Sequence, residues 1–185
     1  MENTCKAFKV RILTHRPMVK PSRDDLDIEN ATIVTSYQID IGNGVPLEEF
    51  EMVAIRYGDT SRIVSVIFDS NVQNDEIYIS PQLWFNLQFQ PLKSEKIIKT
   101  FWKYPLQQPN ASVSLIHLYE LPENDQQLTR IQRAKEIQFN LISSQEYSFP
   151  YDYGSLLKSY FQKSTKYFCK NDVIGFPLIE NSSFV

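Results

Sequence analysis

Histidines are the residues best suited to acid–base chemistry at neutral pH, and this chain has few of them. The 185 residues include two histidines, His15 and His117. His15 lies in a segment flanked by proline, where we expect a solvated side chain. His117 lies within a strand pattern and has no other histidine, cysteine or carboxylate motif nearby in the sequence. A lone histidine of this kind is usually structural, so the histidines predict no catalytic centre.

Clustered carboxylates offer a second kind of chemistry, namely metal binding. Asp24, Asp25 and Asp27 lie close together, and Glu48 is adjacent to Glu49. The glycine and the distal glutamate of a calcium-binding loop are absent from the first cluster. Adjacent carboxylates such as Glu48 and Glu49 do not converge on one substrate atom. We therefore interpret these runs as solvated loops and predict no metal site.

Phosphate binding by a loop needs glycines, because backbone amides must approach the anion closely. The chain has five glycines, and none belongs to a GxxxxGK[ST], GxGxxG or GxSxG pattern. We therefore predict no catalytic residue, no cofactor and no ATP binding in this chain. The expected activity is binding rather than catalysis.

Composition narrows the class of partner. The hydrophobic fraction of 42% is sufficient for a core without metals or disulfides, and the formal net charge is -3. Basic residues are interspersed with acidic ones, which argues against nucleic acid as a partner. No apolar run approaches the roughly 20 residues that span a bilayer. We expect a protein partner and no membrane span.

Cysteine usage and the N-terminal residues indicate the compartment. Cys5 and Cys169 match no zinc or CxxC spacing, so we expect two reduced thiols. The first residues contain no apolar signal-peptide region, which predicts a cytoplasmic location. Asn30, Asn110 and Asn181 each begin an N-x-S/T sequon, and we interpret these as chance matches.

The elements that position these residues are mostly strands. Apolar and polar residues alternate, or β-branched residues are concentrated, in several short runs bounded by turn residues. The strands predicted in the first half are 7–13, 33–41, 50–57, 62–68 and 76–79. Gly58 in the short loop before the fourth run predicts a hairpin.

One helix is predicted in the first half, from Ser80 to Gln88. Ser80 is a suitable N-cap and Pro81 fits the first helical position, where a missing N–H costs nothing. Leu83, Trp84 and Leu87 then recur at helical spacing. We expect Trp84 to pack in the core rather than to bind a ligand.

A boundary is predicted where Pro105 and Pro109 interrupt the pattern. We therefore predict two units, residues 1–105 and residues 106–185. The second unit is expected to contain a sheet and one helix. Its predicted elements are strands at 112–119, 136–142, 167–169 and 172–176 and a helix at 155–163.

Two segments resemble the N-terminal domain of the peroxisomal AAA+ ATPases of the peroxin-6 family. Residues 75–87 resemble a strand that runs into a proline-containing helix start and a Phe-Asn-Leu triplet, here Phe85-Asn86-Leu87. Residues 134–148 resemble a strand ending in Ile-Ser-Ser with a Tyr-Ser pair, and 170–177 resemble the family's Lys-Gly-Asp-Val-Ile strand. Asn171 replaces the glycine, and asparagine tolerates the left-handed conformation that such a turn requires. The first 30 residues match poorly.

The resemblance implies a double-psi β-barrel subdomain followed by a smaller α+β subdomain. It implies a non-catalytic domain that binds adaptors or substrates during peroxisome biogenesis and recycling of the import receptor. ATP and magnesium would bind in ATPase modules beyond Val185. The implied partners are the sister ATPase peroxin-1, a tail-anchored membrane anchor and the import receptor, at the cytosolic face of the peroxisomal membrane.

Two alternatives stay open. The second block also resembles the N-domain of valosin-containing protein, so the N-domain of another AAA+ ATPase, acting in membrane fusion or ubiquitin-dependent extraction, is the first. A small stand-alone double-psi-barrel enzyme is the second, and the missing motifs disfavour it. For partner binding we single out the aromatics near the boundary and in the second half, since Trp and Tyr favour interfaces: Trp102, Tyr104, Tyr151 and Tyr153.

Overall fold

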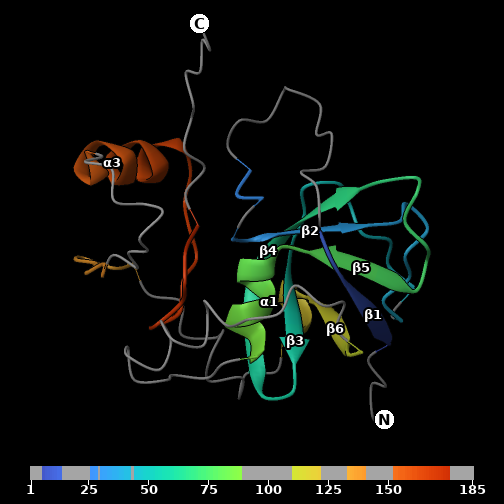
Figure 1. The fold of residues 1–185 in the computed structure, drawn as a ribbon. Coiled ribbons are helices and arrows are strands. Elements are labelled where there is room, and N and C mark those ends of the chain that lie inside the picture. Colours follow the sequence, from blue (N-terminus) through green and yellow to red (C-terminus); the bar gives the residue numbers. More distant parts are fainter. Residues whose placement is uncertain are drawn as a thin grey trace, which may run out of the picture.

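The computed structural model shows a β-barrel with a helix and an extended segment beside it (Figure 1). The fold is mostly β, with two short α-helices among the described residues. The structure describes residues 6–13, 26–28, 30–42, 44–88, 110–121, 133–140 and 152–175.

Six strands form a closed mixed barrel in the order β1-β5-β2-β4-β3-β6, and β6 pairs with β1 to close it. The pairs β1/β5 and β2/β4 are parallel, and the other neighbours are antiparallel. This arrangement is compatible with a double-psi barrel. The strands are β1 (Ala7–Ile12), β2 (Thr32–Thr35), β3 (Met52–Tyr57), β4 (Thr60–Phe68), β5 (Glu76–Ile79) and β6 (Ser112–His117).

Strand periodicity builds the core. Successive side chains of a strand point to opposite faces, so alternate residues of each run face the barrel interior. Burying one such aliphatic side chain contributes about 1.5–3 kcal/mol. The interior is filled by Phe8, Val10, Ile12, Ile33, Val53, Ile55, Val64, Val66, Ile77, Ile79, Val113 and Leu115.

Helix α1 (Pro81–Gln88) closes one end of the barrel. The Ser80 hydroxyl accepts a hydrogen bond from the Leu83 amide at 3.0 Å, which confirms the predicted N-cap. Trp84 is 2% exposed and packs edge-on against Tyr57, with ring centroids 4.9 Å apart. The core role predicted for Trp84 is confirmed.

The segment between β2 and β3 lies at the other end, because β2 and β5 are antiparallel. Its Ile39, Ile41 and Leu47 are buried in the core. The strand predicted at 33–41 is therefore wrong beyond Thr35. The Ser36 carbonyl and hydroxyl accept hydrogen bonds from the backbone amides of the next residues, and these bonds turn the chain out of the sheet.

The hairpin of β3 and β4 is confirmed, with six residue pairs in register from Met52 opposite Ser65 to Tyr57 opposite Thr60. Gly58 adopts a φ of 56°, a left-handed conformation that favours glycine in a tight turn.

Strand β6 lies beyond the predicted boundary and yet closes the barrel. It pairs with β1 and with β3, so the barrel extends to His117 rather than ending at residue 105. The division of the chain into two units stays a prediction.

The predicted second helix is confirmed as α3 (Tyr153–Lys163). The Asp152 carboxylate caps it by accepting hydrogen bonds from the Ser155 hydroxyl at 2.5 Å and the Ser155 amide at 3.1 Å. These bonds lower the pKa of Asp152. Within the described part of the chain, no helix has the length and hydropathy of a membrane span.

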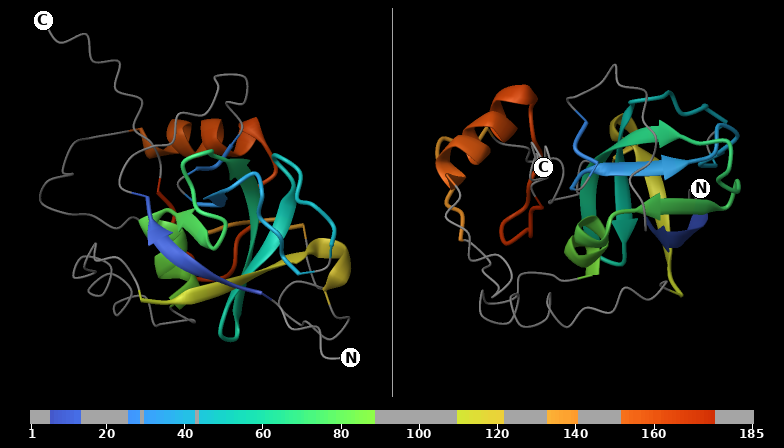
Figure 2. Two further views of the ribbon diagram at one scale, coloured as in Figure 1. Left: turned by 90° about the vertical axis from the view of Figure 1, so that its right-hand side faces the viewer. Right: turned by 45° about the horizontal axis from the view of Figure 1, so that its top comes forward.

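The strands predicted after α3 are wrong, as is the part of strand 136–142 that the structure describes. No strand is assigned to residues 136–140, 167–169 or 172–175. Figures 1 and 2 show residues 165–175 running between α3 and the barrel. Val173 and Gly175 do not pair with a strand because asparagine side chains of the barrel region bind their backbone groups instead.

Candidate functional site

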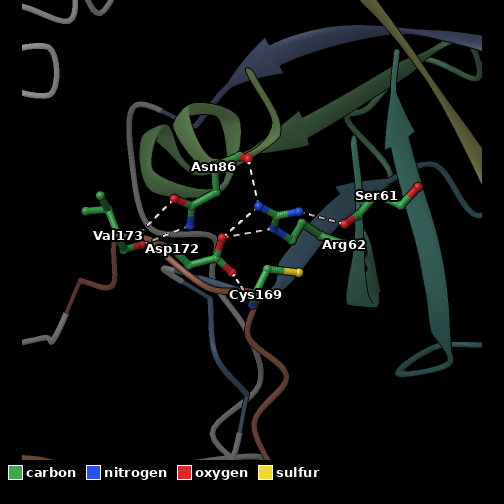
Figure 3. Close-up of polar contacts among 6 residues, drawn as sticks. All are labelled: Ser61, Arg62, Asn86, Cys169, Asp172 and Val173. Atoms are coloured by element: carbon green, nitrogen blue, oxygen red, sulfur yellow. Dashed lines mark hydrogen bonds and ion pairs between the residues drawn. The ribbon is translucent and has the colours of Figure 1, made fainter. Parts of the chain in front are cut away.

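A polar cluster joins the barrel to the extended segment of residues 169–175, hereafter the strap (Figure 3). At its centre, Arg62 of β4 binds Asp172 of the strap. Both Nη2, at 2.7 Å, and Nε, at 3.1 Å, donate to Asp172 Oδ1. The two side chains are 12% and 6% exposed. A charge pair this buried needs further hydrogen bonds to offset its desolvation.

Those further bonds are present on both partners. Arg62 Nη1 donates to the Ser61 carbonyl at 2.8 Å, and Nη2 donates to the Asn86 carbonyl at 3.1 Å. Asp172 Oδ2 accepts from the Cys169 amide at 2.8 Å. Burial raises the pKa of Asp172, and the Arg62 guanidinium and the Cys169 amide oppose that rise. The pair is therefore anchored on both sides of the contact.

The turn before Asp172 is the one expected from the sequence. Asn171 has a φ of 70°, the left-handed conformation for which asparagine substitutes for glycine. The Asp172 amide donates to the Cys169 carbonyl at 3.2 Å, which closes the turn. Cys169 is a free thiol, and burial raises its pKa. A thiol held in its neutral form is a weak nucleophile.

Asn86 of α1 binds both backbone groups of Val173. Its Oδ1 accepts from the Val173 amide at 2.8 Å, and its Nδ2 donates to the Val173 carbonyl at 2.9 Å. Asn86 is 5% exposed and Val173 is 6% exposed. One side-chain amide thus takes the place of a neighbouring strand.

Asn30 repeats this arrangement two residues further along the strap. Its Oδ1 accepts from the Gly175 amide at 2.7 Å, and its Nδ2 donates to the Gly175 carbonyl at 2.9 Å. Residues i and i+2 of an extended chain present their backbone groups to the same side. Asn30, Arg62 and Asn86 therefore form one recognition surface for an extended segment, hereafter the clamp.

A second contact holds α3 near the clamp. The Tyr160 hydroxyl donates to Asp27, and Asn30 Nδ2 contacts both groups. Lys166 Nζ lies 3.8 Å from Asp27 Oδ2 and 4.6 Å from the centre of the Tyr160 ring. Burial, followed by the bond to Asp27, raises the pKa of Tyr160.

The best candidate for acid–base chemistry is the pair of His117 and Glu51. His117 lies at the end of β6, is 1% exposed, and places Nδ1 2.6 Å from Glu51 Oε1. Its ring stacks on Tyr119 with centroids 4.9 Å apart. Within the described residues, Nε2 has no hydrogen-bond partner. Among the described residues, no nucleophilic side chain is therefore hydrogen-bonded to Nε2, as a catalytic triad requires.

Of the four aromatic residues predicted to bind a partner, the described residues include Tyr153 alone. Trp102, Tyr104 and Tyr151 lie outside them. Tyr153 begins α3 and is 36% exposed. Their role stays a prediction. No group of three potential metal ligands occurs in the segments that the structure describes.

The sequence did not indicate the clamp. Asn30 matched a sequon, Asn86 was part of a family triplet, and Arg62 was one residue of a strand. Comparison with family models, with curated proteins and with solved structures finds no match to this chain. The fold and the clamp therefore define a class, a closed six-stranded mixed β-barrel that holds an extended segment through side-chain amides and an ion pair.

Proposed function

We propose that this chain is a non-catalytic, protein-binding N-terminal domain of a peroxisomal AAA+ ATPase. The observation that carries the proposal is a contact between the two sequence blocks on which the family resemblance rests. Asn86 belongs to the Phe-Asn-Leu triplet of the first block, and Val173 belongs to the Lys-Asn-Asp-Val-Ile run of the second. Their two hydrogen bonds give these sequence features one shared physical role.

Two further observations support the proposal. The mixed barrel with two parallel strand pairs is compatible with the double-psi barrel that the resemblance implies. Asn171, the departure from the family pattern, has the left-handed conformation that a glycine would adopt there. The chain would bind proteins for the motor, while ATP and magnesium would bind in separate ATPase modules.

The test is a binding experiment with the three implied partners. The purified chain is immobilised and exposed in turn to peroxin-1, to the tail-anchored peroxisomal membrane anchor and to the import receptor. We expect saturable binding of at least one of them, and no heat of binding when Mg-ATP is titrated into the chain. Binding to none of the three would contradict the proposal.

The same assay separates the remaining candidates. Binding of ubiquitin-dependent or membrane-fusion adaptors instead of the peroxisomal proteins would favour the N-domain of a different AAA+ ATPase. The pair of His117 and Glu51 is the feature that favours a small double-psi-barrel enzyme. A turnover that His117→Gln abolishes, in a folded variant, would establish that alternative.

The aromatic prediction is tested on the same partners. If Trp102 and Tyr153 line the binding surface, replacing either with alanine should weaken binding by about 2 kcal/mol or more, as at an interface hot spot. Tyr37→Ala is the control, since Tyr37 is exposed and was not assigned to this surface. Unchanged affinity in both folded variants would reject the surface and leave the family proposal standing.

A further inference from the structure

Among the described residues, the contacts between the strap and the barrel are hydrogen bonds and one ion pair, together with the buried side chain of Val173. Within residues 152–175, Val173 is the one buried residue, and α3 has none. Elements with little buried apolar area open locally at lower free energy than a core. We therefore expect the strap to leave the clamp at a lower free energy than that at which the barrel unfolds.

The clamp binds the backbone of an extended segment and one carboxylate. Its bonds to Val173 and Gly175 all go to backbone groups, so they do not depend on the side chains of those residues. The bond from Arg62 to Asp172 does depend on a side chain. A foreign segment with an aspartate in the same register would make the same bonds.

At the last position of the strap, a residue larger than glycine would require the Gln82 side chain to shift by a few tenths of an ångström. A Cβ added to Gly175 would lie 3.2 Å from Gln82 Nε2, closer than most Cβ contacts. The side-chain oxygen of Gln82, Oε1, is buried and has no hydrogen-bond partner within the described residues. The site thus includes an acceptor that the strap, as described, does not use, and a bound segment that donates to it would gain a hydrogen bond.

We propose that the clamp is a binding site for an extended segment of a partner protein, with aspartate at the first position, an apolar residue next and a small residue at the fourth. The chain's own residues 172–175 occupy it until the partner segment displaces them. This inference rests on the proposed protein-binding function and specifies its site and the chemistry of its ligand. Because a tethered segment competes at a high effective concentration, the intact chain should bind a free peptide weakly.

The experiment uses a fluorescein-labelled peptide of the chain's own residues 169–177, with serine in place of the cysteine. Its binding to the full chain is measured by fluorescence anisotropy. Asp172→Asn weakens the tethered occupant and leaves the clamp unaltered, so we expect the peptide to bind this variant at least tenfold more tightly than the intact chain. Adding Asn86→Ala to the variant should reverse the gain. Asn71→Ala is the matched control, because Asn71 is an exposed asparagine that bonds Asp69. Adding it to the variant should leave the gain in peptide affinity unchanged.

A peptide with asparagine at its own aspartate position should bind the Asp172→Asn chain at least tenfold more weakly. If the variant fails to fold, hydrogen exchange of the intact chain provides the test. Excess peptide should speed exchange of the Val173 and Gly175 amides. No saturable peptide binding to a folded Asp172→Asn chain, affinity indifferent to Asn86, or unchanged exchange would overturn the inference. Capture of peroxin-1 or the anchor in the preceding assay would be unaffected by that result, so the two proposals fail separately.

Discussion

The barrel and the strap are held in place by different physics. Buried apolar side chains are concentrated in the barrel and in the segments that close its ends, and Val173 is the single one described beyond residue 121. The strap depends on Asn30, Arg62 and Asn86, which make directional bonds to a few of its groups. Area burial spreads stability over many positions, whereas directional bonds concentrate it in few. One substitution can therefore release the strap, while the barrel responds in proportion to the volume removed.

The largest effects, of several kcal/mol, are expected in the barrel core and at the buried ion pair. Ile55→Ala removes a fully buried side chain and should lower the free energy of unfolding by about 2–5 kcal/mol, through lost transfer free energy and a residual cavity. Ile137→Ala is the matched control, since Ile137 is 46% exposed, and should change stability by less than about 0.5 kcal/mol. Urea unfolding measures both. Equal losses in the two variants would contradict the assignment of the core.

Variants of the buried ion pair between Arg62 and Asp172 test the contact between the barrel and the strap. Arg62→Leu or Asp172→Leu alone leaves an unpaired buried charge and should cost about 3–5 kcal/mol, whereas the double variant should cost less than either single one. A double-mutant cycle in urea gives the coupling energy. Additive losses would mean that the two side chains do not interact as the structure has them.

The sequence predicted correctly those elements whose structure is determined by residues close together in the chain. The hairpin around Gly58 and the helix capped by Ser80 are local, so their residue patterns were sufficient. Strand β2 was predicted too long, because Ile39 and Ile41 continue the apolar pattern while lying in the segment that closes the barrel end. Apolar alternation reports burial, and it does not separate a strand from a buried loop.

The candidate site could not be predicted in the same way. Asn86 and Val173 are 87 residues apart, and His117 and Glu51 are 66 apart. No periodicity relates residues at such separations, since the barrel topology brings them together. The one local signal was Asn171, whose turn conformation was expected from its residue type and is confirmed.

A smaller effect is expected from Tyr160 at high pH. Its pKa is raised in the folded state, so the folded chain retains the phenol proton where the unfolded chain loses it. The contribution to stability is complete below the unfolded pKa of about 10 and is lost as the pH rises above it. Urea unfolding between pH 9 and 11 should therefore show a steeper loss for the intact chain than for Tyr160→Phe. Tyr37→Phe, at a side chain that is 62% exposed, should retain the steep loss. Identical slopes in all three would place Tyr160 in solvent.

The most direct test of the difference between the two regions is native-state hydrogen exchange of the full chain in low urea. We predict that the Val173 and Gly175 amides exchange through a local opening, at a lower free energy than the amides of β3 and β4. We also predict that Asn86→Ala accelerates exchange in the strap, by loss of about 1–3 kcal/mol of hydrogen bonding, and leaves the barrel amides protected. Exchange of strap and barrel at one common free energy, falling together in the variant, would contradict these predictions.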